Sequence, residues 1–445
     1  MILRGSALDS GSMAEERRDV TAVRADVCVA GGGPAGQLLG LLLAKRGARV
    51  LVLEGHETFD RDFRGEVLQP STAHLLGALG LLDYIRAQPH STLTAGVVRL
   101  NGRRAGEFAF ARIASEYPYA IWMPQPVFLQ ALADRARAFP SFECWMGARA
   151  TGLVEERGQV VGVTGTRRGR EPFEIRADLV VGADGRFSQL RRLGGFTVAY
   201  EHHDFDVIWF VIPEPPGWSS TLYVSLGGEA QCLLLPKYPH QVQAGILLPT
   251  GVWRQWREAG VAAVADRVRR LDPLFEDFAA GLRDFTPFFP LEGVIRLVED
   301  WARDGLLLIG DAAHTMSPAG AIGVNVALAT AAVTAQVVYP RLGRGPILRA
   351  DLAEVQAIRE PDVRALHRLQ LGAQSLLLAQ ARRGRVARWI LPWLLPALLR
   401  SPLLPRLQRR IFFGAPLPPL DPAFAMGSGP TISTNPSGRG ASLDG

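Results

Sequence analysis

The stretch GLLLIGDAAHTMSPAGAIGVNVA, residues 305–327, brings together side chains that could do chemistry. An apolar run ends at Gly310 and Asp311, and His314 follows three residues after the aspartate. This pair could belong to a metal site or to an acid–base pair. One Asp and one His without a third ligand make a poor zinc site, and the chain has no nucleophile elbow and no paired-carboxylate signature. We therefore expect no metal and assign no catalytic side chain, because a cofactor is the better source of the chemistry.

A second glycine-rich stretch, GGGPAG at residues 31–36, predicts the class of cofactor. It lies between two apolar runs of strand type, DVCVA at 26–30 and ARVLVLE at 48–54, and a helical pattern fills the space between the turn and the second run. Glu54 ends the second run, 18 residues past Gly36. Strand, glycine turn, helix, strand and acid in this order indicate a βαβ dinucleotide-binding unit.

Each glycine of the G-x-G-x-x-G spacing has a physical reason. Gly31 permits a tight turn, Gly33 lets the backbone approach a pyrophosphate, and Gly36 lets the helix pack close to the strand. The N-terminus of the helix then faces the negative phosphates, and Glu54 accepts hydrogen bonds from the adenosine ribose. This fingerprint alone does not distinguish FAD from a nicotinamide nucleotide.

A third segment narrows the choice of cofactor. DLVVGADGRFSQLRR, residues 178–192, has a buried-strand pattern that ends at Asp184 and Gly185. Together with GGGPAG and the stretch 305–327, it resembles the three motifs of the single-component flavoprotein monooxygenases of the para-hydroxybenzoate hydroxylase type. The resemblance implies an α/β fold with a Rossmann-like FAD-binding domain of the glutathione-reductase type. It also implies an inserted antiparallel β-sheet substrate domain and a C-terminal helical region.

The resemblance implies contacts between named residues and FAD. Asp311 would hydrogen-bond the ribityl chain, while Asp184 and Gly185 would lie beside the cofactor and help to form the approach of the nicotinamide nucleotide. Pro318 would begin the turn next to the flavin ring. The segment up to Asn325 would lead into a helix whose N-terminus stabilises the anionic reduced flavin. The other implied cofactor contacts are Pro34, Ala35, Arg64, Gln125, Ala150, Gly310, Gly320, Gly323 and Val324.

The sequence departs from this family pattern at several positions. Relatives often have glycine where this chain has Ala321 and Ala327, and aspartate where it has Thr330. After Glu54 relatives often have a basic residue, whereas this chain has Gly55. These departures leave FAD binding in place but weaken a close analogy in substrate.

Short β-rich runs separated by Gly and Pro fill residues 200 to 290 and predict an antiparallel sheet. In the family this sheet forms the floor of a substrate chamber above the flavin. Candidates for apolar chamber contacts are Trp209, Tyr223, Leu233 and Leu235, although each is more often a core residue.

The C-terminal region has helical and basic character. Its apolar run at 389–399 is too short to span a bilayer, which takes about 20 residues. It is either a helical lid on the substrate domain or an interfacial segment that contacts an anionic membrane. The second interpretation rests on Arg382, Arg383, Arg385, Arg400, Arg406, Arg409 and Arg410. The predicted regions are a disordered N-terminus (1–24), a discontinuous FAD-binding domain (25–200 and 290–345), a β-rich substrate domain (201–289), a helical lid (346–425) and a disordered tail (426–445).

Composition limits the class of protein. The 445 residues are 48% hydrophobic with a net charge of +6, which favours a globular protein and gives no indication of a nucleic-acid partner. Three scattered cysteines and no visible signal peptide favour a cytoplasmic protein, with contact at the inner face of the membrane as the alternative. The oligomeric state stays open.

The function that these motifs favour is that of an FAD-dependent monooxygenase. The resemblance implies that NADPH or NADH reduces FAD, that O₂ then gives a flavin hydroperoxide, and that an apolar, aromatic or polyketide-like small molecule is hydroxylated or epoxidised, as in secondary metabolism. No second G-x-G-x-x-G follows a strand, so NAD(P)H would bind transiently. The alternatives are a flavin-dependent reductase of a prenyl-type lipid, a flavin halogenase, and a non-catalytic flavin-binding membrane-associated protein.

Overall fold

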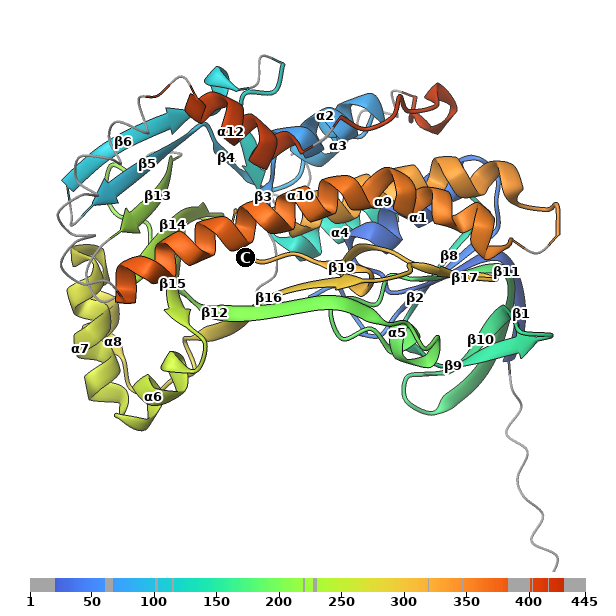
Figure 1. The fold of residues 1–445 in the computed structure, drawn as a ribbon, viewed down its shortest axis with the longest axis horizontal. Coiled ribbons are helices and arrows are strands. Elements are labelled where there is room, and N and C mark those ends of the chain that lie inside the picture. Colours follow the sequence, from blue (N-terminus) through green and yellow to red (C-terminus); the bar gives the residue numbers. More distant parts are fainter. Residues whose placement is uncertain are drawn as a thin grey trace, which may run out of the picture.

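The computed structural model of the chain describes residues 21–60, 67–100, 103–113, 116–218, 221–226, 230–318, 320–345, 347–382, 401, 403–414 and 416–427. Within these residues, two eight-stranded sheets and one three-stranded sheet are combined with helices (Figure 1). The α/β fold class expected from the sequence is confirmed, since a largely parallel sheet and a largely antiparallel sheet occur in one chain.

The first sheet carries the predicted βαβ unit. Its strand order is β17-β18-β11-β1-β2-β8, and β1 pairs in parallel with both β2 and β11. β2 and the adjoining ends of β1 (Val27–Ala30) and β11 (Leu179–Gly182) are buried on both faces, which explains their continuous apolar sequences. Their bounds are β1 Thr21–Ala30, β2 Val50–Glu54, β8 Phe142–Met146, β11 Glu171–Gly182, β17 Ala302–Arg303 and β18 Leu306–Leu308, with β9 Ala148–Glu156 and β10 Gln159–Arg167 attached through β11.

The second sheet has the order β19-β16-β12-β15-β14-β13-β5-β6. Four of its strands lie wholly or almost wholly outside the segment 201–289 in which the sequence predicted an antiparallel sheet. β5 and β6 precede β12 by about a hundred residues and join through β13, while β16 and β19 follow the segment. The bounds are β5 Ala95–Leu100, β6 Arg103–Ala109, β12 Val198–Pro213, β13 Thr221–Leu226, β14 Gln231–Lys237, β15 Gln241–Pro249, β16 Phe289–Val298 and β19 His314–Thr315.

The two faces of the second sheet are both apolar but serve different purposes. One face, with Phe210, Leu234 and Ile246, packs against α6 (Val252–Glu258), α7 (Val261–Leu271) and α8 (Glu276–Gly281). The opposite face, with Val207, Trp209 and Leu235, forms a separate cluster with aromatic residues from other elements. Because side chains alternate along a strand, each strand contributes to both clusters.

Helices cover the first sheet and connect the two halves. α9 (Gly323–Val338) contacts both α1 (Pro34–Lys45) and α10 (Arg349–Arg382), and α10 extends along most of the long axis of the molecule (Figure 1). The stretch Gly323–Arg341 is long and apolar enough to cross a membrane, but 67% of its most apolar window is buried inside the protein. It is therefore a core helix.

The remaining elements lie around the third sheet, which has the order β3-β7-β4. Helix α12 contacts α2, and the segment after α12 reaches the C-terminal end of α1, where Arg46 forms an ion pair with Asp421 at 2.8 Å. The bounds are β3 Val67–Leu68, α2 Pro70–Ala78, α3 Leu82–Arg86, β4 Ser91–Leu93, β7 Ala120–Trp122, α4 Gln125–Arg137, α5 Gln189–Leu193 and α12 Leu403–Phe413. The apolar run at 389–399, residues 1–20 and the tail after 427 lie outside the described residues.

Candidate cofactor and substrate site

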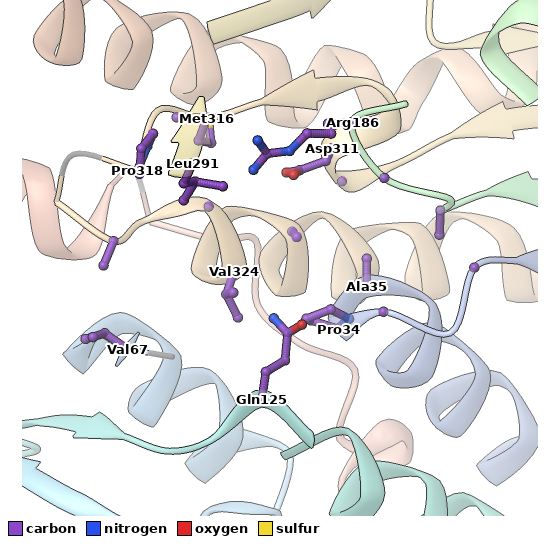
Figure 2. Close-up of a pocket in the computed structure, with 18 of the residues that line it drawn as sticks. Pro34, Ala35, Val67, Gln125, Arg186, Leu291, Asp311, Met316, Pro318 and Val324 are labelled. Atoms are coloured by element: carbon purple, nitrogen blue, oxygen red, sulfur yellow. The ribbon is translucent and has the colours of Figure 1, made fainter. Parts of the chain in front are cut away.

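A cavity of about 970 Å³ is lined by residues from both large sheets and by the first residues of α1 and α9 (Figure 2). This volume is at the upper end of the range for ligand sites in proteins. Most of the residues assigned from the sequence to the cofactor and some of those assigned to the substrate line this same cavity. They are Gly31, Gly33, Pro34, Ala35, Glu54, Gln125, Ala150, Asp184, Gly185, Gly310, Asp311, Pro318, Gly320, Gly323, Val324, Trp209, Leu233 and Leu235.

The glycine turn before α1 has three different local environments. Gly31 has a φ of +113°, and a Cβ there would lie 2.3 Å from the Ala183 carbonyl oxygen. A Cβ on Gly36 would lie 1.9 Å from the Gly31 carbonyl oxygen, so Gly36 permits close packing and does not itself line the cavity. A Cβ on Gly33 would meet nothing within 4 Å, because this position faces the open cavity. The N–H groups of the first turn of α1 therefore face free space.

Glu54 is fixed at the end of β2, where it is only 2% exposed. Its carboxylate accepts hydrogen bonds from the Gly32 amide at 3.0 Å and from the His56 amide at 2.9 Å. The His56 ring lies 2.7 Å from the same carboxylate. These contacts hold an acceptor at the cavity wall, where the sequence predicted a ribose contact.

A basic side chain from another strand occupies the space beside Gly55. Arg149, on β9, donates from Nε to the Gly55 carbonyl oxygen at 3.2 Å, and a Cβ on Gly55 would meet this side chain at 3.1 Å. Arg149 and its neighbour Ala150 both line the cavity. The cation that relatives have directly after the acid is thus supplied from β9, which the sequence order did not reveal.

Asp184 organises the loop between β11 and α5. Its carboxylate accepts hydrogen bonds from the Gln189 amide at 2.6 Å, the Leu190 amide at 3.1 Å and the Ser188 hydroxyl at 2.5 Å. Gly185 follows with a φ of +81°, so the chain turns sharply there. The same loop is tied to the segment after β18, because the Arg191 guanidinium donates to the Ala312 carbonyl oxygen at 3.0 Å.

Asp311 lies in the turn Gly310–Ala312 after β18 and lines the cavity (Figure 2). Gly310 has a φ of +58°, and a Cβ on it would lie 3.4 Å from Ala35 and 3.5 Å from Ala327. Small residues from three segments therefore meet at this point. The close approach brings the Asp311 turn next to the N-terminus of α1.

His314 does not share the environment of Asp311. Its side chain is fully buried against Trp301, and its Nε2 lies 3.1 Å from the Thr330 hydroxyl. Burial lowers the pKa of His314 to about 3, so the ring is neutral. Among the described residues, no group of three or more His, Cys, Asp and Glu side chains is arranged to hold a metal ion.

The start of α9 presents backbone amides to the cavity. Its N-cap residue, Ile322, offers no capping side chain, and Gly323 and Val324 line the cavity. Asn325 does not line it. Instead the Asn325 side chain accepts from the Gln69 backbone amide at 2.8 Å and donates to the Ala321 carbonyl oxygen at 2.9 Å. Asn325 therefore lies behind the cavity wall and joins the start of α2 to the loop before α9.

Gln69 lines the cavity but was not predicted from the sequence. It is 3% exposed, and its Nε2 donates to the Gly320 carbonyl oxygen at 2.9 Å. Gln69 lines the cavity, and its buried Oε1 has no hydrogen-bond partner among the described residues. The glycine loop before α9 is therefore held from α2, whose N-cap is Gln69. Arg64, which was also assigned to the cofactor, lies outside the described residues.

The substrate end of the cavity is formed by the second sheet and aromatic residues. Tyr223 does not line it, since its ring faces the opposite side of the sheet and packs at 4.7 Å from Trp218. Its neighbours Leu222 and Val224 line the cavity instead, as the alternation of side chains along a strand requires. The other wall residues that the sequence reading did not assign include Phe108, Phe110, Trp122, Gln243, Leu291, Met316 and Phe412.

The cavity fits a flavin dinucleotide by the chemistry of its walls. Two helix N-termini, those of α1 and α9, supply unpaired N–H groups, the open space at Gly33 admits a phosphate, and Glu54 offers a buried acceptor. The far end is apolar. A dinucleotide with a planar ring system can thus lie between the fingerprint and the second sheet.

Comparison with known proteins agrees with this arrangement. Residues 24–337 match the FAD binding domain family. Relatives include 6-methylpretetramide 4-monooxygenase of Streptomyces rimosus, 36% identical over 87% of this chain and 92% of that protein. Protoasukamycin 4-monooxygenase of Streptomyces nodosus subsp. asukaensis is 26% identical over 80% of this chain and 89% of that protein. Among solved structures, the p-nitrophenol 4-monooxygenase PnpA of Pseudomonas putida DLL-E4 shares the fold, with a TM-score of 0.70 and 21% identity over 89% of this chain and 99% of that one.

Proposed function

This chain belongs to the FAD-binding domain family and is an FAD-dependent monooxygenase, and from that premise we propose that it hydroxylates an apolar aromatic substrate of polyketide type. The observation that supports this substrate class most directly is the continuity of the cavity. Its walls run from the dinucleotide fingerprint at Gly33 to an apolar floor that includes Trp209 and Leu233. The names of the two relatives above give 6-methylpretetramide and protoasukamycin as the substrates of those enzymes, which supports a substrate of this class for this chain.

We assign the binding of FAD to residues at four places in the cavity wall. Glu54 binds the ribose, the N-terminus of α1 binds the pyrophosphate, and Asp311 binds the ribityl chain. The N-terminus of α9 lies at the flavin ring, where its partial positive charge favours the reduced anion. When bound, FAD accepts a hydride from NAD(P)H and activates O₂, so that one oxygen atom goes to the substrate and the other to water.

The protein's own contribution at the substrate end is to orient the ring system and to exclude water. Trp209, Leu233 and Leu235 provide an apolar floor, and Phe412 adds an aromatic wall from α12. A dry chamber strengthens the electrostatic effect of the α9 amides and suppresses loss of the activated oxygen to peroxide. The ring of Phe412 stacks on that of Phe108, with the centroids 6.1 Å apart, which supports a role of α12 in enclosing the chamber.

The direct test is turnover of the purified holoenzyme with NADPH or NADH, ¹⁸O₂ and a library of polycyclic aromatic polyketides. We expect substrate-dependent consumption of the nicotinamide nucleotide and a product that contains one labelled oxygen atom. Oxidation of the nucleotide that yields only peroxide with every aromatic member, or a halogenated product when halide is supplied, would refute the proposal. Parallel assays with the two nucleotides show which one serves as donor.

We also propose that the enzyme acts in the cytoplasm and that any membrane contact is peripheral and made by the C-terminal region. Arg406, Arg409 and Arg410 are exposed on α12, which is the part of the predicted basic segment that the structure describes best. Sedimentation with anionic liposomes at low ionic strength tests the contact. Absence of binding there would leave the lid as the remaining interpretation.

A further inference from the structure

The cavity-facing side of the second sheet carries one polar side chain in an apolar surface. Within the described residues, this sheet lines the cavity with Phe108, Trp209, Leu222, Val224, Leu233, Leu235, Gln243 and Leu291. All are apolar except Gln243, on β15. Val242 and Ala244, its neighbours in sequence, face the opposite side and pack under α6 to α8.

Gln243 is buried without a hydrogen-bond partner. It is 6% exposed, and its Oε1 is inaccessible and unpaired within the described part of the chain. A buried amide without a partner is destabilising, because it has lost its hydrogen bonds to water. A ligand in the cavity that hydrogen-bonds the Gln243 amide would offset this cost.

A second unpaired group lines the same cavity. Trp122, on β7, is fully buried, and its indole Nε1 has no acceptor among the described residues. The Trp122 ring lies 5.6 Å from the Nζ of Lys237, on β14. Lys237 follows Leu235 on the same face of that strand, and Leu235 pairs directly with Gln243. Gln243 and Trp122 therefore belong to the same end of the chamber.

We propose that Gln243 and Trp122 form a polar anchor that selects substrates with a hydrogen-bond donor next to an acceptor, as in an aromatic primary carboxamide. The carboxamide oxygen accepts from the Trp122 indole and the Gln243 Nε2, while its N–H donates to the Gln243 Oε1. The apolar floor then holds the ring system. This inference rests on the proposed function, since it names which substrates of the monooxygenase the chamber prefers.

Binding of simple probes to the FAD-loaded protein tests the anchor by isothermal titration calorimetry, without turnover. The probes are 2-naphthamide with donor and acceptor, 2-acetylnaphthalene with the acceptor alone, and 2-isopropylnaphthalene with neither. In Gln243→Met, which keeps length but removes the amide, we expect the Kd for 2-naphthamide to rise about 10- to 100-fold. The Kd for 2-isopropylnaphthalene should change by less than about 3-fold, because only apolar contacts hold it.

Two further variants separate anchoring from structure. Trp122→Phe keeps a ring but removes the N–H. It should raise the Kd of 2-naphthamide and 2-acetylnaphthalene by about 5- to 20-fold and leave the Kd of 2-isopropylnaphthalene unchanged. Gln241→Met is the matched control, because Gln241 lies two residues before Gln243 on β15 and does not line the cavity. It should leave all three Kd values unchanged.

The inference is overturned if wild-type protein does not bind 2-naphthamide, or if Gln243→Met and Trp122→Phe shift all three probes equally or not at all. Flavin content and ¹⁸O incorporation are measured on the same preparations. A protein that holds FAD and oxygenates polyketides but shows no probe selectivity refutes only the anchor. A protein with selective binding but no oxygen transfer refutes the proposed function instead.

Discussion

At the scale of single residues, the glycine turn contains two positions that have different surroundings, in line with the different roles expected from the sequence. Gly33 faces the open cavity, while Gly36 abuts the Gly31 carbonyl oxygen. A methyl group at Gly33 occupies space needed by a phosphate, whereas a methyl group at Gly36 collides with the fold itself. Gly33 is therefore needed for ligand binding, and Gly36 is needed for the packing of α1.

Gly33→Ala should therefore fold with unchanged stability but bind FAD at least about 10-fold more weakly, since the phosphate loses close amide contacts. Gly36→Ala should reduce the free energy of unfolding of the apoprotein by about 2–3 kcal/mol through overpacking against backbone. Chemical denaturation of the apoprotein and flavin fluorescence titration measure the two effects. Equal loss of stability in both variants would contradict the separation.

Asp311→Ala should weaken FAD binding by about 10- to 100-fold, because the ribityl hydroxyls lose a charged acceptor. Asp311→Asn keeps an acceptor oxygen without the charge, so its affinity for FAD should lie between those of Asp311→Ala and the wild type. Retained flavin per protein after gel filtration gives the measurement. Unchanged flavin content in Asp311→Ala would show that the carried-over role does not apply to this chain.

At the scale of elements, α10 contains a buried ion pair under the GDAAH segment. Arg359 and Asp362 are 3% and 8% exposed and lie 3.2 Å apart. The Arg359 Nε also lies 3.5 Å from the hydroxyl of Thr330 on α9. In this chain, the charge next to Arg359 is supplied one turn along its own helix.

Removing one member of this ion pair should lower the free energy of unfolding more than removing both members. Asp362→Leu should lower the free energy of unfolding by about 3–5 kcal/mol, because it leaves a buried guanidinium without its counter-charge. The double variant Arg359→Met with Asp362→Leu should recover most of this loss. Chemical denaturation of the wild type, Asp362→Leu and the double variant measures the coupling between the two side chains. A double variant that is less stable than Asp362→Leu would contradict this coupling.

The elements also show how far the sequence determines the site. The βαβ unit, the loop at Asp184 and the turn at Asp311 were placed correctly at the cavity because each combines a strand pattern with local glycine or proline. Tyr223 was assigned to the wrong side of its strand, although the period of two and the position of Leu222 could have shown this. Arg149, Gln69 and Phe412 could not be found locally, since they reach the cavity through pairings between distant segments.

At the scale of the whole molecule, two buried histidines link stability to pH. Burial lowers the pKa of His314 to about 3 and that of His367 to about 4. In the unfolded chain both rings take up protons near pH 6.5, whereas in the folded protein they stay neutral. The unfolded state thus binds more protons below that pH, so stability falls as the pH decreases from about 6.5 towards 4.

Between pH 7.5 and pH 5.5, each of these histidines should lower the free energy of unfolding by about 1 kcal/mol. His314→Gln keeps a hydrogen-bonding group near Thr330 and should remove about half of the combined effect. His240→Asn, at an exposed turn with a φ of +48°, is the control and should leave the pH dependence unchanged. Urea unfolding at the two pH values gives the measurement, and equal pH dependence in wild type and His314→Gln would contradict it.

The composition of the cavity wall has a consequence for synthesis on the ribosome. The wall begins with Ala30 and includes Phe412, and β1 pairs with β11, which lies about 150 residues later in the chain. A nascent chain therefore exposes the fingerprint long before the chamber can close, and the edge of β1 that pairs with β11 stays open after β2 has been made. Cofactor capture is a late event of biogenesis, so a product truncated before α12 would have the fingerprint but not an enclosed site.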